Sequence, residues 1–512
     1  MLENFGRGGA INRTLKNLPI TNHVPEYIGN ISSLPAYRLV QNTTGLFRGK
    51  ESKQITGFRT WRYTLEELVS FLAAFKASRA HDTIYAILGL ASDFTPVDGT
   101  ESKIEHQNEV PKRDTGQASR TPRRSVTMKE GPNLERIETN ERRAALQELR
   151  RQNTTLQTGW SRDPKKFPVD YTLPVLQVFK DFLDRAIKNS QSLDILCRPW
   201  APSSGLNAEG EEEKIDLPSW MASLSRKPFQ ETKERNMVRF NPDPLVGAAL
   251  FRHRIYGASG GEELYCDIDL KNPNSKRITV KGFVLDTIGE IWDSAAFGNV
   301  PAIWLTEGGG WTDVEEVPPG ELWRTLVADR NGHGSEPDRW YPLVFKSAAK
   351  DRGLSYGFET YRLIYESGNS AVSEVFKRVQ AVVWNRRLIR TQGQYMKWWT
   401  NGKHESGALG LVPREARKDD LICIIFGCSV PLVLRKIVAT PSRNGSNPTI
   451  HGRIGKGPEE TNSNTVNSTT ANTAPEELYT LIGECYIDHM MDGEAIFYKN
   501  ESDVESQNFI LE

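Results

Sequence analysis

A serine lies in a glycine-rich run whose spacing matches the nucleophile elbow of α/β-hydrolases. The run is Gly257-Ala258-Ser259-Gly260-Gly261, and in an elbow such a serine is the nucleophile of ester hydrolysis. The elbow needs a buried strand before the serine and a helix after it. Residues 251–256 are instead charged, and residues 262–270 are typical of a strand. The sequence therefore favours a plain glycine-rich connection, and a serine hydrolase that uses Ser259 is the alternative.

Three cysteines and a histidine near the C-terminus, Cys423, Cys428, Cys485 and His489, have the donor types of a zinc site. Cys423 and Cys428 are five positions apart, and an odd offset within one strand points side chains to opposite faces. Only a turn at Gly427 could bring the two thiols together. Buried cysteines usually act as small hydrophobic residues. We therefore predict core thiols, no metal site, no cofactor and no catalytic residue.

The elements that would position these residues begin with helices. The stretch from Thr64 to Ser78 has apolar residues at helical spacing, and Thr64 with Glu67 forms a capping-box pattern. Residues 82–90 predict a short buried helix or helical turn. Pro174 begins a longer predicted helix with an apolar stripe on one side.

Two long stretches are poor in the residues that build a core. Trp160 is the single aromatic residue between positions 97 and 166, and residues 441–475 contain no Phe, Trp or Tyr. Such segments cannot bury enough apolar surface to offset the entropy of ordering the backbone. We predict a disordered insertion over 97–166 and a disordered loop over 441–475.

Short apolar runs separated by Gly, Pro and Asn dominate the second half of the chain and predict strands. One helical pattern, Ala371–Trp384, interrupts them. The predicted fold is α+β, an N-terminal helical segment followed by a mostly antiparallel β barrel or sandwich with a helical insertion. The expected strands are Leu217–Leu224, Leu264–Leu270, Ile278–Ile288, Leu421–Phe426, Pro431–Ile437 and Leu478–Ile487.

Composition limits the classes of function. Lys plus Arg and Asp plus Glu each number 65, so the net charge is zero and no overall field favours nucleic acid or an anionic membrane. The first 16 residues lack the apolar region of a signal peptide, and no apolar run approaches the roughly 18 residues that span a bilayer. With five cysteines, an odd number, the chain is expected to be cytoplasmic, with neither nucleic acid nor membrane as a partner.

Several motifs, taken in order, resemble the heterokaryon-incompatibility family of filamentous fungi. The run RAHDTIYAILGLA at Arg79–Ala91 is similar to the family pattern DPRDKVYALLGLA, with Ala80 and His81 where Pro and Arg are common. The other similar segments are Val169-Asp170-Tyr171, Leu217-Pro218-Ser219-Trp220, Tyr256–Gly261, Gly410–Pro413, Asp419–Cys423, Gly427–Arg435, Tyr479–Tyr486 and Met491–Ala495. Their shared order over most of the chain is specific.

The resemblance implies a cytoplasmic, non-enzymatic protein of fungal non-self recognition and programmed cell death, with other proteins as partners. The family's defining HET domain carries an early motif of the kind YxALSYxWG, and nothing in Met1–Tyr63 matches it. The chain is therefore expected to be the C-terminal portion of such a protein.

The chain is expected to begin with a helical remnant that follows the HET domain (1–96), then the disordered insertion (97–166) and a helix that packs on the core (167–200). A β-rich domain follows (215–440 and 476–499), with its helical insertion near 371–384. The disordered loop (441–475) interrupts this domain, and a flexible tail (500–512) ends the chain. We also expect Asp492-Gly493 to be a hairpin turn into a strand over Glu494–Tyr498.

Overall fold

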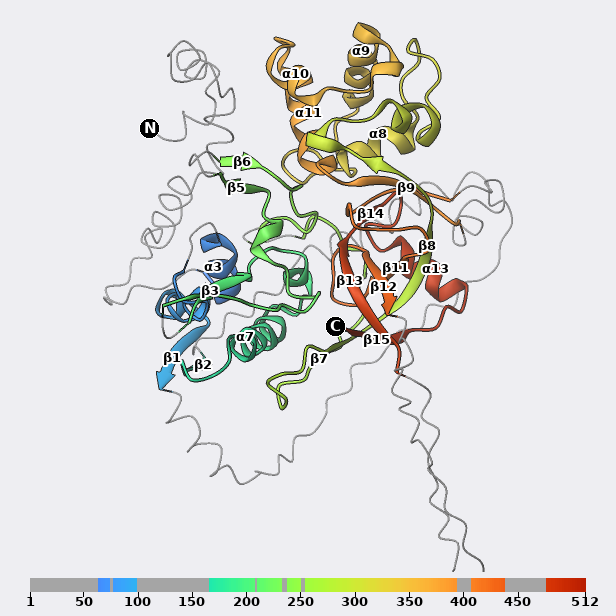
Figure 1. Cartoon of the computed structure of the whole chain (residues 1–512). Coiled ribbons are helices and arrows are strands. Elements are labelled where there is room, and N and C mark those ends of the chain that lie inside the picture. The colour runs from blue at the N-terminus through green and yellow to red at the C-terminus, as the bar shows by residue number, and fades with distance from the viewer. Residues whose placement is uncertain are drawn as a thin grey trace, which may run out of the picture.

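The computed structural model describes residues 63–73, 77–98, 165–207, 210–232, 237–249, 254–393, 407–437 and 476–512 (Figure 1). The predicted loop over 441–475 and most of the predicted insertion over 97–166 lie outside these residues, as does the chain before residue 63. The N-terminal helical segment as a whole is therefore not confirmed, and only its last part can be compared with the prediction.

The first described helix, α3 (Leu65–Leu72), has the capping box that the sequence predicts. The backbone N–H of Thr64 donates to Glu67 Oε2 at 2.7 Å, and the N–H of Glu67 donates to Thr64 Oγ1 at 3.3 Å. Two free N–H groups of the first turn are thereby satisfied. The predicted turn over 82–90 is also present, as α4 (Asp82–Tyr85) and a 3-10 turn, Leu88–Leu90.

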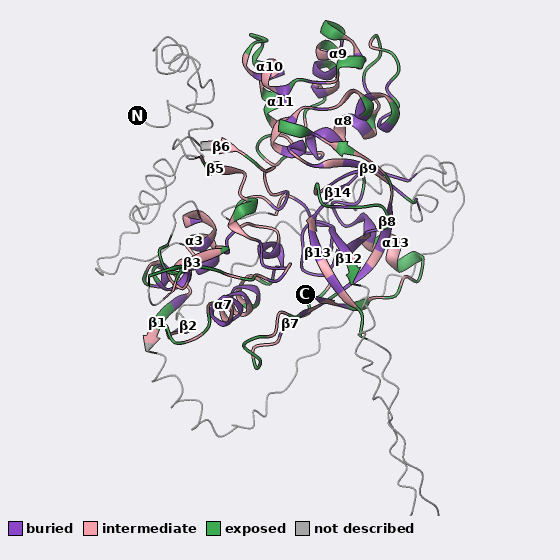
Figure 2. Cartoon of the chain, viewed as in Figure 1, coloured by how far each residue is buried: buried purple, intermediate pink, exposed green. Residues whose placement is uncertain are grey.

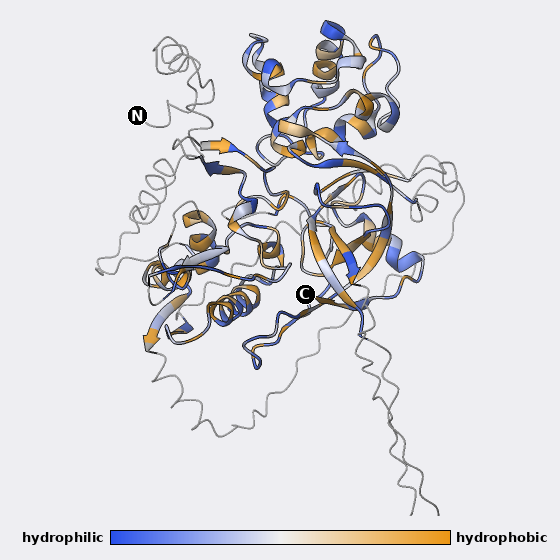
Figure 3. Ribbon diagram, in the orientation of Figure 1, coloured by the Kyte–Doolittle hydropathy of each residue, from blue (hydrophilic) through white to orange (hydrophobic). Residues whose placement is uncertain are grey.

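Two parallel strands, β1 (Phe94–Asp98) and β2 (Lys165–Val169), lie on either side of the undescribed residues 99–164. Ordered structure thus extends past both limits predicted for the insertion. Helix α7 (Val175–Ser190) follows, with Pro174 as its N-cap, and confirms the apolar stripe. Figure 3 shows its hydrophobic and hydrophilic sides. Its buried apolar residues include Phe179 and Phe182, whose rings meet Trp200 edge to face.

The predicted strand over Leu217–Leu224 is wrong. This segment is irregular and ends in a 3-10 turn, Leu224–Arg226, because buried Trp220 anchors it through a hydrogen bond from Nε1 to the carbonyl of Lys276 at 2.7 Å. Two small hairpins lie on either side of it: β3 (Ser204–Leu206) with β4 (Glu212–Lys214), and β5 (Phe229–Glu231) with β6 (Met237–Arg239).

Five strands close a β-barrel in which each strand pairs with the next and the last returns to the first. All of these pairings are antiparallel except that of β13 with β15, and the barrel part of the prediction is confirmed. In order around the barrel the strands are β8 (Ile278–Ser294), β11 (Leu421–Ile425), β12 (Leu432–Ile437), β13 (Leu478–Glu484) and β15 (Gln507–Leu511).

The long strand β8 continues beyond the barrel into additional pairing. It pairs with β7 (Cys266–Ile268) along its first half and with β9 (Arg387–Thr391) along its second. From β9 the sheet continues to β10 (Leu409–Val412) and β14 (Tyr486–Ile487). A single strand thus joins both parts of the sheet.

Strand β11 is apolar on both faces because each face covers a different core. Cys423 and Ile425 belong to the large core shared with α7 and the helices, whereas Ile422 and Ile424 belong to a smaller core with residues of β8. The alternation of side chains along a strand divides the run in this way. Figure 2 shows the resulting burial along the barrel strands.

Two glycines permit this geometry. Gly427, between β11 and β12, has a φ of 91°, and a Cβ there would lie 2.4 Å from Leu264 Cδ1. Gly483 has a φ of 149° where the register of β12 against β13 shifts, as at a β-bulge.

The helical insertion is larger than the predicted Ala371–Trp384. It fills the chain between β8 and β9 with α8 (Gly320–Val327), α9 (Tyr341–Arg352), α10 (Thr360–Tyr365) and α11 (Ser370–Val383), and it stands above the barrel in Figure 1. Of the added helices, α8 and α10 have only 8 and 6 residues, so a sequence pattern of helical period is hard to see in them.

Two predictions for the C-terminus are wrong. Glu494–Glu501 is helix α13, with Gly493 as its N-cap at φ 101°, instead of the second strand of a hairpin. Residues 500–512 contain β15 instead of a flexible tail. The side chains of Phe509 and Leu511 are fully buried, and the strand pairs with β8 and β13. Its order comes from these partners, which are distant in sequence.

Candidate functional site

Ser259 lies in a turn and not at a nucleophile elbow. The side chain is buried, and within the described stretch 254–277 the chain after Gly261 runs without a helix into β7. The turn is held by the N–H of Gly257, which donates to the carbonyl of Met491, and by the N–H of Ala258, which donates to that of Ser429. The structural requirement for an elbow is therefore not met here.

The cysteines of the zinc hypothesis are all buried, in β11, in the β11–β12 turn and just after β13. Burial raises the pKa of the Cys423 and Cys485 thiols. The fourth residue, His489, has a side chain that is 52% exposed and contacts Asp488. Within the described ranges, no group of three or more His, Cys, Asp or Glu side chains is placed to hold a metal ion.

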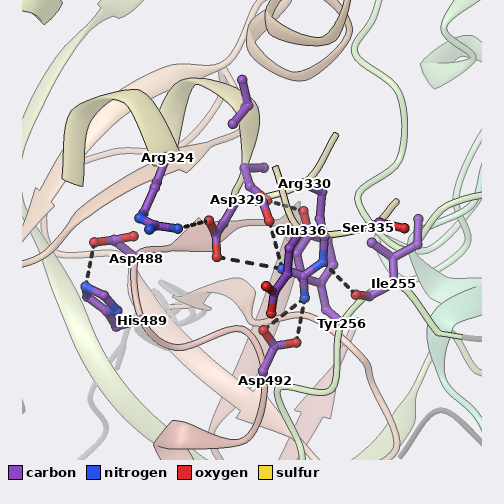
Figure 4. A network of polar contacts seen from close by, with 12 residues as sticks. Ile255, Tyr256, Arg324, Asp329, Arg330, Ser335, Glu336, Asp488, His489 and Asp492 are labelled. Carbon is purple, nitrogen blue, oxygen red and sulfur yellow. Dashed lines mark hydrogen bonds and ion pairs between the residues drawn. The ribbon is translucent and has the colours of Figure 1, made fainter. Parts of the chain in front are cut away.

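A buried ion pair that the sequence did not reveal lies in a network of polar contacts around the end of α8 (Figure 4). Arg330 follows α8, and Asp492 directly precedes the N-cap of α13. The Nη2 atom of Arg330 lies 2.7 Å from Asp492 Oδ1 and 2.9 Å from Oδ2, and both side chains are about 95% buried. Such a pair is stable only when the remaining donors of the guanidinium are also satisfied.

The remaining donors of Arg330 are satisfied by main-chain oxygens. Nε donates to the carbonyl of Ile255 at 3.0 Å, and Nη1 donates to that of Asp329 at 2.8 Å. The guanidinium also lies over the ring of Tyr256, 4.4 Å from its centroid, and the hydroxyl of Tyr256 donates to the carbonyl of Ala328. One arginine thereby connects the segment before Ser259, the end of α8 and the segment before α13.

The backbone that presents Arg330 is itself unusual. Ala328 and Asp329 are consecutive left-handed residues, with φ values of 50° and 46°. This conformation is unfavourable for residues other than glycine and persists where surrounding contacts hold it. Here Arg324 Nη1 donates to Asp329 Oδ1 at 2.6 Å, and Arg378 Nε from α11 donates to the carbonyl of Arg330 at 3.0 Å.

Another acidic residue of the network, Asp488, has a neighbour that faces solvent. The hydroxyl of Tyr486 donates to Asp488 Oδ1 at 2.9 Å, and His489 Nε2 lies 3.2 Å from Oδ2. Burial raises the pKa of Asp488 to about 6, with Glu321 and Asp329 as nearby negative charges. This carboxyl is therefore harder to ionise than an exposed aspartate.

A second buried ion pair connects the helices to the barrel at another place. Arg386 Nη2, just after α11, lies 2.6 Å from Glu484 Oε1 at the end of β13. The same oxygen of Glu484 also accepts a hydrogen bond from the N–H of Leu245 at 2.7 Å, and Oε2 accepts one from the N–H of Val246 at 3.4 Å. Burial raises the pKa of Glu484 and lowers that of Arg386, because the low-dielectric surroundings disfavour both charges.

A third polar cluster connects the N-terminal helices to the barrel. Arg198 Nη1 lies 2.8 Å from Glu66 Oε1 on α3, and its Nη2 lies 3.7 Å from Asp194 Oδ2. Asp194 also accepts a hydrogen bond from the N–H of Ser429 at 2.7 Å. The three clusters share one property: in each, an arginine pairs with a carboxylate from a distant segment of the chain.

Sequence reasoning did not predict that Arg330, Arg386 and Glu484 form buried ion pairs. Asp492 and Glu484 do lie inside the motifs Met491–Ala495 and Tyr479–Tyr486, but those motifs do not indicate the partner of either carboxylate. A single arginine in a polar run has no periodicity that marks it as buried.

Comparison with known proteins adds no family assignment. A scan against protein-family models, a search of curated proteins and a search of solved structures each found no match to this chain. Among the described helices, none has the length and apolar character needed to cross a membrane.

Proposed function

We propose that this chain is a non-enzymatic recognition or regulatory protein of the heterokaryon-incompatibility type, which acts in the cytoplasm in fungal non-self recognition and cell death. Its partners in this proposal are other proteins. The observation that carries it is the position of the family-like motifs: they lie at the joints between segments, where they hold the fold together.

The first two motifs contact each other. The hydroxyl of Tyr85 donates to the carbonyl of Asp170 at 3.2 Å, and that of Tyr171 donates to Asp82 Oδ1 at 2.6 Å. The ring of Tyr85 meets that of Tyr171 edge to face at 5.1 Å. These contacts join α4 to the chain before α7, on opposite sides of residues 99–164, and so support a scaffolding role for both motifs.

The later motifs meet around the barrel. The run after Tyr256 bonds through its backbone to Ser429 and Met491, which belong to two other motifs. The hydroxyl of Ser219, in the segment like LPSW, accepts from the N–H of Leu481 at 3.0 Å. The residues of the family-like motifs named here therefore serve mainly as contacts between segments. This supports a protein that acts by binding partners at its surface and not by catalysis.

The test is regulated expression of the full chain in a filamentous fungus, with dye uptake by hyphal cells as the measure of death. We expect death to increase with the amount of protein, and we expect Ser259→Ala to act like the original chain at equal abundance. Asp492→Ala is expected to abolish the response because it breaks the joint.

Two results would contradict the proposal. One is normal viability at every level of expressed, folded protein. The other is loss of the response in a folded Ser259→Ala variant together with ester hydrolysis by the original chain, which would favour the serine hydrolase.

A further inference from the structure

Two cysteines far apart in the sequence meet where the turn after α7 contacts the β11–β12 turn. The N–H of Leu193 donates to the carbonyl of Gly427 at 2.9 Å, and the N–H of Ser429 donates to Asp194 Oδ1 at 2.7 Å. Cys428 lies between these two anchored residues. Cys197 lies one turn beyond Asp194, and its own N–H donates to the carbonyl of Asp194 at 3.0 Å.

These hydrogen bonds make the two cysteines neighbours, and neither is in a disulfide. In agreement with this closeness, the Cys428 thiol raises the pKa of the Cys197 thiol. Cys428 is fully buried, whereas Cys197 is partly exposed at the edge of the large core. Cys266 is also partly exposed, but its charged neighbours are Asp184, Asp267 and Lys188.

We propose that Cys197 and Cys428 are an oxidisable pair whose disulfide joins the segment after α7 covalently to the β11–β12 turn. The backbone hydrogen bonds on both sides of Cys428 hold the two segments in register, so the pair can close without a large movement of either. Arg198, the residue after Cys197, holds the same segment through Glu66. This inference is independent of the proposed function.

The oxidant in this proposal is a small-molecule disulfide such as oxidised glutathione. Cys197, the partly exposed residue of the pair, loses its thiol proton to solvent and attacks one sulfur of glutathione disulfide, which releases the first glutathione as a thiolate that is then protonated. The Cys428 thiol gives up its proton and attacks the Cys197 sulfur of the mixed disulfide, which releases the second glutathione. Two electrons pass from the cysteine pair to glutathione disulfide, and one protein disulfide and two glutathione thiols result.

The surroundings determine the rate of the first step. The Cys428 thiol and burial raise the pKa of the Cys197 thiol well above its ordinary value. Since the thiolate is the attacking species, its concentration and the rate rise about tenfold per pH unit below that pKa. The pair is expected to stay reduced at neutral pH under reducing conditions and to close in an oxidising, alkaline medium.

The experiment treats the purified full chain with oxidised glutathione at pH 7, 8 and 9, blocks remaining thiols with N-ethylmaleimide and identifies linked peptides by mass spectrometry. We expect a peptide pair containing Cys197 and Cys428, formed faster at each higher pH. The oxidised chain is also expected to migrate faster on a non-reducing gel and to melt at a higher temperature than the reduced chain.

Matched variants separate this pair from other thiols. Cys197→Ala and Cys428→Ala should each abolish the link, whereas Cys266→Ala should retain it. The linkage in the unaltered chain is measured without any variant, so a variant that fails to fold does not affect the test. A link between Cys428 and Cys485, or a glutathione adduct on Cys197 that never proceeds to a protein disulfide, would overturn the proposal.

Discussion

Arg330 and Asp492 form a two-oxygen ion pair at 2.7 and 2.9 Å although 162 residues separate them in the chain. The pair connects the end of α8 to the start of α13, and Tyr256 covers the guanidinium. It therefore holds the helical insertion and the last helix in a fixed relation to the turn that contains Ser259.

Asp492→Ala should lower the free energy of unfolding by about 3–5 kcal/mol, because it leaves the Arg330 guanidinium buried without its counter-charge. Urea unfolding of the purified chain measures this. Lys188→Ala is the matched control, since Lys188 pairs with Asp184 on the surface and exposed helix pairs contribute only about 0.5 kcal/mol. Equal losses of unfolding free energy in the two variants would show that the buried pair contributes no more to stability than a surface pair.

Asp488→Asn should change how stability depends on pH. The pKa of Asp488 is about 6 in the folded chain, against about 3.9 when unfolded. Folding therefore favours the protonated form of Asp488. The stability that this group contributes to the folded chain is fully present below about pH 4 and is lost as the pH rises through 6.

The Asn variant cannot ionise, so relative to the original chain it should gain stability as the pH rises from 4 to 7, by about 1–3 kcal/mol. Urea unfolding at pH 4.5, 6 and 8 measures the difference. Glu476→Gln, at an exposed carboxylate, should leave the curve parallel to that of the original chain. A constant difference at all three pH values would contradict the assignment.

Phe509→Ala should cost about 3–5 kcal/mol because it empties a fully buried site in a closing strand of the barrel. Asn508→Ala, at the exposed neighbouring position, is the control and should change little. Thermal melting of both variants tests the point. If the Phe509→Ala variant melts at the same temperature as the original chain, residues 507–511 do not close the barrel.

Lys180→Met should loosen the loop between β7 and β8. The buried Nζ of Lys180 donates to the carbonyls of Asp269, Asn272 and Ser275 at 2.8, 2.7 and 3.3 Å. Methionine keeps most of the volume but leaves three carbonyls without this donor. Hydrogen exchange should accelerate in residues 269–277 and stay unchanged in β12. Acceleration throughout the barrel would indicate global unfolding instead.

Ile424→Ala tests the smaller core. The side chain is 1% exposed on β11, and its truncation should cost about 2–5 kcal/mol. Lys436→Ala on the exposed end of β12 is the control. Unchanged thermal stability of the Ile424 variant would be inconsistent with a strand covered on both faces.

The sequence by itself determined the elements whose signals are local. The stripe on α7, the capping box of Thr64 with Glu67, and the apolar runs on both sides of Gly427 each follow from residues within a few turns or strand positions of one another. Helix periodicity, capping and short apolar runs depend mainly on such near neighbours, so these patterns predicted α3, α7 and the strands β11 and β12.

Only the tertiary structure decided the elements and contacts that depend on distant partners. Residues 507–511 have no strong pattern of their own and become a strand because β8 and β13 supply backbone partners. In the sequence, Glu494 is equally compatible with the start of a strand after a hairpin turn. In the structure it begins a helix, and its side chain accepts a hydrogen bond from the N–H of Asp492. The contacts of Arg330 with Asp492 and of Cys197 with Cys428 exist only once the chain has folded, because hydrophobic burial brings these segments together. The sequence pattern does not record which distant segments become neighbours in space.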